Sequence, residues 1–408
     1  MDWLKVHLSN IATVNMGQSP PSNSYNNTGK GLPLFQGKAQ FGAIHPTPIK
    51  WCTEPTKIAQ KNDILMSVRA PVGPTNIADQ ICCIGRGLAA IRAKKDIAEQ
   101  KYLYWLFKFI ERSISDLGQG STFKTINHSN IESISISLPT LSEQHRIVDI
   151  LDQADALRRN RLEADKISDR ILPNLFIKMF GDPATWDVSN TKPLGELVNI
   201  QGGGTPSKKN LQYWEGEIPW VSPKDMKQDI IYDSIDHISE LAIKETNLRY
   251  IESGAILIVV RGMILAHTIP IAIAGTRLTI NQDMKAMYPK GKEIDSTYLQ
   301  TTLKASSKII LSQLGTAGHG TRKLDTEYLL NLPIFIPSQD QLNRFQLSFS
   351  YSHQLSSKFA KVKIKLETLF QTLQNRAFSG DLTAKWREGH LKELLQEMEH
   401  QAKLLNNN

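Results

Sequence analysis

The sequence predicts a mixed α/β (α+β) protein that consists of two tandem copies of one domain. Two long helices separate the copies and pack as a coiled-coil pair, so the chain has a pseudo-two-fold internal repeat. Three observations predict this fold class: an internal repeat that covers most of the chain, short β-rich runs within each copy, and a long helical pattern after each copy. The elements are justified below in that order.

The internal repeat starts near the beginning of the chain. The stretch Leu8–Pro21 reads LSNIATVNMGQSPP, and Leu194–Ser207 reads LGELVNIQGGGTPS at an offset of about 186 residues. This offset is too long for a solenoid, so it indicates a duplicated domain. The match continues as far as the Leu-Pro pair at 138–139 and the Ile-Pro pair at 336–337. Core segments agree in apolar pattern while loops differ, so two copies of one scaffold carry different surfaces.

Within each copy, short β-rich runs are followed by helical stretches. A mixture of this kind, with strands and helices in one unit, predicts an α/β or α+β domain. The predicted strands are residues 64–68, 131–138, 256–260, 269–273 and 332–336, and the predicted helices are 102–114 and 298–311.

Two long segments have helical periodicity instead. In the first, Ile147, Ile150, Leu151, Ala154 and Leu157 form one apolar face, which continues with Ile167, Ile171, Leu175 and Met179. In the second, apolar residues alternate spacings of four and three, which is a heptad seam. Its members are Leu355, Phe359, Val362, Leu366, Leu369 and Leu373.

Each segment is long enough for a helix of about 38 residues, or roughly 57 Å. A single helix cannot bury such a stripe by itself, so we expect the two to pack on each other, parallel or antiparallel. Pro173 is expected to kink or break the first helix near Leu172. The predicted division is a first domain at 1–140, a first spacer helix at 141–182, a second domain at 190–337, a second spacer helix at 338–383 and a polar C-terminal tail at 384–408.

Composition and charge narrow the class of protein. The 408 residues carry a formal net charge of +8 and a sequence pI of about 9.2, which favours a polyanionic partner. The longest apolar run, residues 255–260, is too short for a membrane span. The first ten residues lack the apolar core of a signal peptide, so we expect a cytoplasmic protein. Cys52, Cys82 and Cys83 lack metal-binding spacing and are interpreted as core thiols.

Motifs for catalysis are missing from the sequence. An adenine methyltransferase needs a Gly-rich cofactor motif and an Asn/Asp-Pro-Pro-aromatic loop, and neither occurs. Residues 202–208, GGGTPSK, superficially suggest a phosphate-binding P-loop, but the second glycine and the Lys-Ser/Thr pair are misplaced. The ten histidines are scattered without metal-ligand spacing. We therefore predict no catalytic residue and no metal site.

Several motifs in their order resemble one known family. They are SEQHRIVDILDQADALRRNR from Ser142, its closing MFGD, the GGGTPS loop, IPWVSPKDM at 218–226, INQDMKA at 280–286, CIGRGLAAIR at 83–92 and QNRAFSGDLTAKWRE at 374–388. Together with the duplication and the alternating helices, they resemble the specificity subunit of Type I restriction-modification systems over essentially the whole chain.

The resemblance implies a non-catalytic subunit for DNA sequence specificity. Each copy is then a target recognition domain that reads one half of a bipartite double-stranded DNA target, and the helices fix the spacing. The implied partners are two methyltransferase (modification) subunits and motor/nuclease (restriction) subunits, without a membrane. The chain itself needs no cofactor, because S-adenosylmethionine, ATP and Mg are expected on the partner subunits.

Two other interpretations stay open. The chain could be a fragment of a fused restriction-methylation enzyme, which S-adenosylmethionine binding by the isolated chain would support. It could also be a protein-binding scaffold. Salt-sensitive DNA binding separates that case, because phosphate contacts give a steep salt dependence.

Candidate DNA contacts come from the turns and the ends of strands. Gly203 and its neighbours form either a tight turn or a place where backbone amides, with Thr205 or Ser207, approach phosphate. Gln18 and Ser19 occupy the matching place in the first copy. The other polar candidates are Asn281 and Gln282, whose amides suit adenine edges, or which form an ordinary turn.

Basic residues complete the candidate interface. Arg69 and Arg261 each end an apolar run and are solvated strand ends or contacts to phosphate or guanine, while Arg86 suits guanine. The Gly/Thr/basic loops at 119–124 and 319–323 are predicted to bind phosphate. The basic candidates in full are Lys38, Arg69, Arg86, Lys124, Lys208, Lys209, Lys224, Arg261, Lys285, Arg322 and Lys323.

Overall fold

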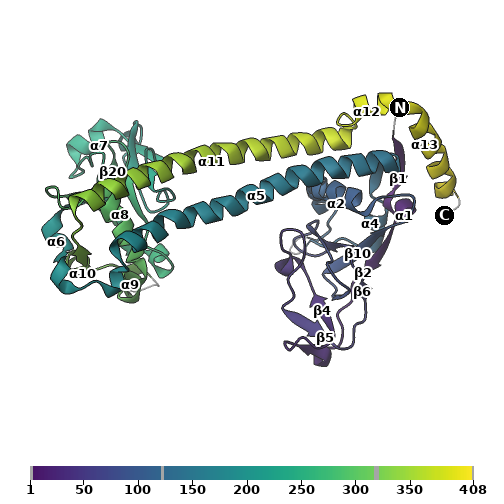
Figure 1. Cartoon of the computed structure of the whole chain (residues 1–408), viewed down its shortest axis with the longest axis horizontal. Helices are drawn as coiled ribbons and strands as arrows, with labels where there is room; N and C mark the ends of the chain where they lie inside the picture. Colours follow the sequence, from purple (N-terminus) through teal and green to yellow (C-terminus); the bar gives the residue numbers. More distant parts are fainter. Residues whose placement is uncertain (1–2, 121–123, 317–320, 407–408) are drawn as a thin grey trace. The chain divides into compact units, whose positions relative to one another are not determined.

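The computed structural model describes residues 3–120, 124–316 and 321–406. The chain forms two compact units, which are described separately: Met1–Arg161 together with Val362–Asn408, and Leu162–Lys361 (Figure 1). Each unit contains one copy of the repeat and parts of both long helices. The predicted fold class, two mixed α/β domains with two long helices, is confirmed.

The first unit contains two main sheets. An antiparallel sheet has the order β2–β10–β7–β8, and a mixed sheet has the order β3–β5–β4–β9–β6, in which β4 and β9 are parallel. Strand β1 (Leu4–His7) pairs with β11 (Ser135–Leu138). The sheet strands are β2 Ala12–Met16, β10 Leu88–Ala93, β7 Ile64–Ser67, β8 Thr75–Ile77, β3 Tyr25–Asn26, β5 Lys50–Cys52, β4 Leu32–Phe35, β9 Cys82–Ile84 and β6 Ile58–Ala59.

Residues 64–66 of strand β7 are all apolar because both faces of the strand are covered. Successive side chains of a strand point to opposite faces of the sheet. Ile64 and Met66 therefore enter the core that includes Tyr102 and Phe107, while Leu65 enters a second core with Phe35. The consecutive apolar residues 64–66 are therefore explained by a strand that lies between two cores.

The second unit repeats this plan with its own additions. A five-stranded sheet has the order β13–β21–β17–β19–β15, and β14 lies between β16 and β20. A small sheet has the order β18–β23–β22, and β12 pairs with β24. The strands are β13 Val198–Gly202, β21 Met284–Pro289, β17 Ile256–Val259, β19 Ile271–Ala274, β15 Ile230–Ile231, β14 Ile218–Val221, β16 Asp236–Ile238, β20 Thr279–Ile280, β18 Arg261–Gly262, β23 Arg322–Lys323, β22 Gly315–Thr316, β12 Thr191–Pro193 and β24 Pro333–Phe335.

The short helices occur in matching pairs. In the first unit they are α1 (Leu8–Ile11), α2 (Gln100–Phe109), α3 (Glu111–Asp116) and α4 (His128–Glu132). Their counterparts in the second unit are α6 (Leu194–Leu197), α8 (Ser296–Ala305), α9 (Ser307–Ser312) and α10 (Thr326–Leu330), and α7 (Glu240–Glu245) is an addition there. The predicted repeat is therefore a repeat of structure as well as of sequence.

The two long helices are α5 (Leu141–Phe180) and α11 (Gln339–Ser379). In the first unit, the start of α5 shares a core with the end of α11, through Ile147 and Phe370. In the second unit, the end of α5 packs on the start of α11, where the Phe176 and Phe345 ring centroids are 5.7 Å apart. Both contacts require the helices to run antiparallel, which settles the orientation.

The predicted seam is wrong in part. Val362 and Leu369 are 43% and 50% exposed, and on α5 Ile167 and Ile171 are 59% and 54% exposed. At its end α11 instead buries Phe370 and Ala377. The reason is that this end of α11 packs on α2 as well as on α5, because Phe370 meets Trp105, and this contact turns a different face inward.

Pro173 does not break α5, so the expectation of a break, the second of the two alternatives, is wrong. The helix continues through Pro173 to Phe180. A proline inside a helix removes one backbone hydrogen bond. Here the following turns are held by burial, because Phe176 and Phe180 lie among Tyr298 and Phe345 in the core of the second unit.

Replacing Pro173 with Ala is expected to stabilise the second unit. The backbone N–H returns and the helix-interior cost of proline is removed, so the free energy of unfolding should rise by about 1–3 kcal/mol. The midpoint of chemical unfolding measures this change. The control is Asn174→Ala, at an exposed neighbouring position of the same helix, where we expect little change. An unchanged midpoint for Pro173→Ala would show that α5 carries no such penalty.

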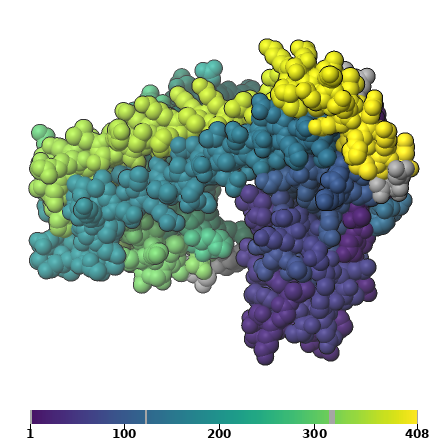
Figure 2. Space-filling view, turned by 45° about the vertical axis from the view of Figure 1, so that its right-hand side comes forward, coloured from purple at the N-terminus to yellow at the C-terminus, as the bar shows by residue number. Residues whose placement is uncertain are grey.

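The segment predicted as a polar tail, 384–408, contains two helices. It forms α12 (Ala384–Gly389) and α13 (Leu391–Asn406), which lie against the first unit (yellow in Figure 2). Leu394 and Gln401 are buried, and the Gln401 Nε2 donates to the Ile97 carbonyl at 2.8 Å. Leu394 and Gln401 are seven residues apart on one face of α13. Most residues around them are charged or polar, so this buried face is not evident from the sequence.

The three cysteines are free and buried, so their interpretation as core thiols is confirmed. Burial raises the pKa of Cys82 to about 12 and that of Cys83 to about 11, which keeps both thiols protonated near neutral pH.

Within residues 3–120, 124–316 and 321–406, no helix combines the length and the hydropathy that a membrane crossing requires.

Candidate nucleic-acid interface

Four predicted residues of the first unit surround one pocket of about 620 Å³. Ser19, Lys38, Arg69 and Arg86 line it. They follow the ends of strands β2, β4, β7 and β9 respectively, so the ends of four strands lie around this pocket. The three cationic side chains are exposed. Their convergence makes a site that can hold an anionic or hydrogen-bonding group, such as a phosphate or a guanine edge.

Gln18 and Lys124 extend this surface. Gln18 is exposed, and its backbone N–H donates to the Ile84 carbonyl at 3.0 Å. A β-bridge joins Arg69 to Thr125, so the exposed Lys124 lies beside Arg69. The predicted phosphate loop thus meets the end of β7, although its residues 121–123 lie outside the described part of the chain.

The second unit brings three predicted cations together on its small sheet. Arg261 pairs with Lys323, and Gly262 pairs with Arg322. We call Arg261, Arg322 and Lys323 the cationic sheet. Arg261 follows β17 as Arg69 follows β7, and these pairings align Lys124 of the first unit with Arg322 of the second, and Thr125 with Lys323. Each unit therefore has an arginine after its central strand and a cation on the segment that pairs with it, and the second unit has Lys323 where the first has Thr125. Residues 317–320 of this second loop lie outside the described residues.

The turn after β13 presents several polar candidates. Thr205, Ser207, Lys208 and Lys209 are all exposed. The Thr205 hydroxyl donates to the Gln282 Oε1, which joins the turn to the loop before β21. This contact leaves the amide nitrogen of the exposed Gln282 side chain as a donor for a base or a phosphate.

Gly203 has a packing role, which favours the tight turn of the two interpretations offered for it. A Cβ at this position would lie 2.2 Å from the carbonyl oxygens of Ile280 and Asn281. Gly17 is in the same situation, 2.2 Å from the Gly85 oxygen. The alternative interpretation, a tight turn, therefore accounts for Gly203. At Gly202 the nearest atom is the Lys285 Nζ, at 3.2 Å, which is the movable end of a flexible side chain.

This difference predicts unequal effects of two neighbouring substitutions. Gly203→Ala forces the backbone around Ile280 to move and should cost about 1–3 kcal/mol of stability. Gly202→Ala is the matched control, because only the Lys285 side chain has to shift. Thermal unfolding of both variants measures the difference. Equal melting temperatures would contradict the packing role of Gly203.

Three further candidates are engaged with the protein itself. Asn281 is 6% exposed, and its Oδ1 accepts from the Asp283 backbone N–H at 3.1 Å, so its position favours the turn and not an adenine contact. Lys224 forms an ion pair with Asp236 at 2.6 Å. Lys285 is half-buried on β21, opposite Gly202.

Sequence reasoning missed the polar residues that fill out the pocket of the first unit. Gln36, Tyr25 and Ser67 also line it. The Gln36 Nε2 donates to the Tyr25 hydroxyl at 3.4 Å. Gln36 directly follows the buried run of β4, as Arg69 follows that of β7, and this pattern was the signal that could have identified it.

Comparison with known proteins identifies relatives of the chain. A family model described as "Type I restriction modification DNA specificity domain" matches residues 1–172 and 184–347. The chain is 42% identical to a putative type I restriction enzyme MjaX specificity subunit of Methanocaldococcus jannaschii over 177 residues, 42% of each chain. It is 36% identical to the EcoR124I/EcoR124II specificity subunit of Escherichia coli over 154 residues, 38% of each chain.

These matches span about two fifths of the length of the two relatives. A solved structure is similar over more of the chain. The Type-I restriction-modification S subunit from M. genitalium superposes with a TM-score of 0.60 at 18% identity, covering 93% of this chain and 96% of that one. At this identity the likeness concerns the fold.

Proposed function

Because the chain belongs to the family of Type I restriction modification DNA specificity domains, we propose that it is a non-catalytic subunit that gives a restriction-modification complex its DNA sequence specificity. The observation that carries the proposal is the duplicated cationic arrangement, Arg69 with Lys124 in one unit and Arg261 with Arg322 in the other. Two equivalent surfaces on two copies of a scaffold suit a bipartite double-stranded target.

The cations and the polar turns have different roles in this proposal. Arg and Lys contacts to phosphates supply affinity and fix the register of the protein on the duplex. The differing loops supply the choice of bases, through groups such as the Arg86 guanidinium and the Gln282 amide. Equivalent cations with unlike loops therefore explain how one scaffold reads two different half-sites.

The long helices are the proposed spacer. With 40 and 41 residues, α5 and α11 are each about 60 Å long. Half-sites on one face of the duplex are one helical turn, about 34 Å, apart or a multiple of it. An antiparallel pair of helices of this length is sufficient to set such a distance.

The partners are two methyltransferase subunits and motor/nuclease subunits. Exposed apolar side chains on α11 support a protein partner, since Leu347 and Tyr351 are 73% and 66% exposed and lie one helical turn apart. S-adenosylmethionine, ATP and Mg belong to the partner subunits, and the chain itself holds no cofactor. We place the complex in the cytoplasm, where its DNA is.

Domain exchange tests this function. Replacing residues 190–337 with the matching domain of a relative should change one half of the methylated sequence and leave the other half unchanged. The reciprocal control replaces residues 1–140 and should change only the other half. Sequencing of methylated DNA, produced by the reconstituted methyltransferase complex, gives the motif. A change in both halves from one exchange would contradict the proposal.

A further inference from the structure

The matching helices α2 and α8 differ in the side chains that they turn toward the long helices. Tyr102 of α2 and Tyr298 of α8 occupy equivalent positions. Each is buried, and its hydroxyl donates a hydrogen bond to a backbone carbonyl in the last strand of its domain. The acceptors are the Ser137 oxygen at 2.9 Å and the Phe335 oxygen at 2.8 Å. Three residues later, Trp105 in α2 corresponds to Thr301 in α8.

In the first unit an indole ring fills the space between α2 and the long helices. Trp105 is buried and packs edge-on against Phe370, with 5.6 Å between ring centroids. Its Nε1–H donates to the Asp152 Oδ1 at 2.9 Å. The Arg158 guanidinium lies over the same Phe370 ring, 4.3 Å from its centre.

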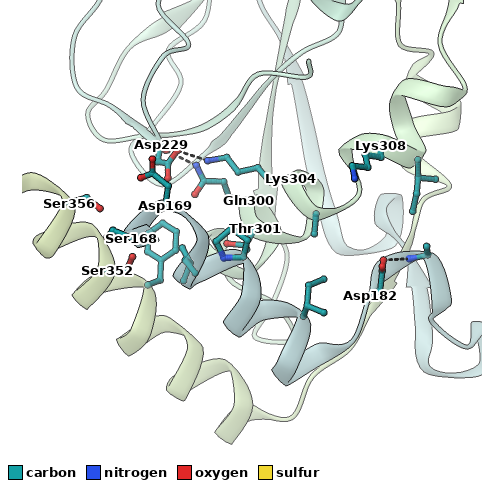
Figure 3. A pocket seen from close by; sticks show the side chains of 17 residues that line it. Ser168, Asp169, Asp182, Asp229, Gln300, Thr301, Lys304, Lys308, Ser352 and Ser356 are labelled. Atoms are coloured by element: carbon teal, nitrogen blue, oxygen red, sulfur yellow. Dashed lines mark hydrogen bonds and ion pairs between the residues drawn. The ribbon is translucent and has the colours of Figure 1, made fainter. Parts of the chain in front are cut away.

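In the second unit the same place is a cavity of about 600 Å³ (Figure 3). Thr301 stands where the first unit has Trp105, and Ser352 and Ser356 of α11 add only small side chains. Leu172 and Phe349 give the cavity apolar walls. Its volume falls in the range of about 300–1,000 Å³ that is usual for binding pockets.

One buried acceptor of this cavity has no donor. Gln300 lines it and is 1% exposed. The Gln300 Nε2 donates to the Asp229 carbonyl at 2.6 Å, but its Oε1 has no hydrogen-bond partner among the described residues. The neighbouring Lys304 is directed to the Asp229 carboxylate, at 2.6 Å. A buried acceptor without a partner costs free energy, and a bound group with an N–H donor would remove this cost.

We propose that this cavity receives a tryptophan side chain from a partner protein, with its indole N–H donated to the Gln300 Oε1. The first unit shows the chemistry, since its own tryptophan fills the equivalent space and satisfies its N–H there. An apolar ring with one N–H also fits a cavity that combines the apolar Leu172 and Phe349 with the unpaired Gln300 Oε1. The inference rests on the proposed function in one respect, because it takes the partner to be a methyltransferase subunit.

The isolated full-length chain tests the site without any partner. Ligand-observed NMR measures the binding of N-acetyl-tryptophanamide and of its N1-methyl analogue, which has no N–H donor. The unmodified probe should bind at least about fivefold more tightly, as expected for a lost hydrogen bond to a buried group. Gln300→Leu should remove this difference, and Thr301→Trp should abolish binding because the new ring fills the cavity.

The control is Thr368→Trp, which adds the same ring at an exposed position of α11 outside the cavity. This variant should bind the probe as the unaltered chain does. Thermal unfolding checks that each variant is folded. If Thr301→Trp does not fold, the comparison with Gln300→Leu still tests the site. Equal binding of both probes by the unaltered chain, or no binding, would overturn the assignment of the site.

Assembly with the cognate methyltransferase subunit tests the source of the ring. Thr301→Trp should weaken assembly about 30-fold, the effect of losing one anchoring aromatic contact. If the variants and the unaltered chain assemble equally well, the inference fails while the proposed function stands. If the unaltered chain does not assemble, the proposed function fails. Probe binding that persists at full strength in the assembled complex would overturn a partner tryptophan as the occupant.

Discussion

Replacing Arg261 and Lys323 together with Ala should weaken DNA binding about 10- to 100-fold at moderate salt, with nearly the same loss on every sequence. Each cation that contacts a phosphate contributes about 0.9 to the slope of log affinity against log salt concentration, so the slope should fall by about two. Both residues lie on the cationic sheet and are exposed, and their pairing uses backbone atoms that Ala retains. Fluorescence anisotropy with labelled duplexes at several salt concentrations measures both quantities.

The matched control removes two exposed cations elsewhere in the same unit, at Lys244 and Lys292. It lowers the net charge equally, so any general effect of charge is shared and only the local contact differs. An unchanged salt slope for the Arg261 and Lys323 variant would place the DNA somewhere else. A loss confined to one sequence would mean that these side chains read bases.

Glu143→Ala should destabilise the first unit by about 3–5 kcal/mol, the usual cost of removing one partner of a buried ion pair. Glu143 is 1% exposed and accepts hydrogen bonds from three side chains. The Trp3 Nε1 donates at 3.0 Å, the Arg387 guanidinium at 2.9 Å, and the Thr383 hydroxyl also donates to it. The substitution therefore leaves a largely buried guanidinium without its carboxylate and releases α12.

Urea unfolding of the first unit measures this loss. Glu388→Ala, an exposed carboxylate of α12, is the control and should change stability by less than about 0.5 kcal/mol. Adding Arg387→Ala to Glu143→Ala should cost less than the sum of the two single changes, because both remove the same interaction. Additive losses would show that the two side chains stabilise the unit independently.

The repeat and the strand positions could be predicted from the sequence because burial determines them. Residues 64–66 of β7 are apolar because this strand lies between two cores, and the matching run at 256–259 is apolar because all four of its side chains are buried in the core of the second unit. The helix face of α11 could not be predicted, because Phe370 is turned inward by Trp105, a residue far away in the sequence. The fold of residues 391–406 was missed because its buried face consists of few residues among many charges.

The candidate interface was predictable where a residue follows a buried strand. Arg69 and Arg261 stand out in the sequence for this reason, and their exposure agrees with it. The pairing of Arg261 with Lys323 joins distant segments and depends on tertiary structure. Whether a polar side chain is free also depends on its neighbours, as the ion pair of Lys224 with Asp236 and the burial of Asn281 show.

The central claim is that the chain directs methylation to one bipartite DNA sequence. Methylation-sensitive single-molecule sequencing of the host genome, with and without the gene, tests it most directly. The account predicts that deletion removes N6-methyladenine from a single split motif, and that the intact gene restores it. A methylation map that is the same with and without the gene, in cells that express the methyltransferase partner, would contradict the account.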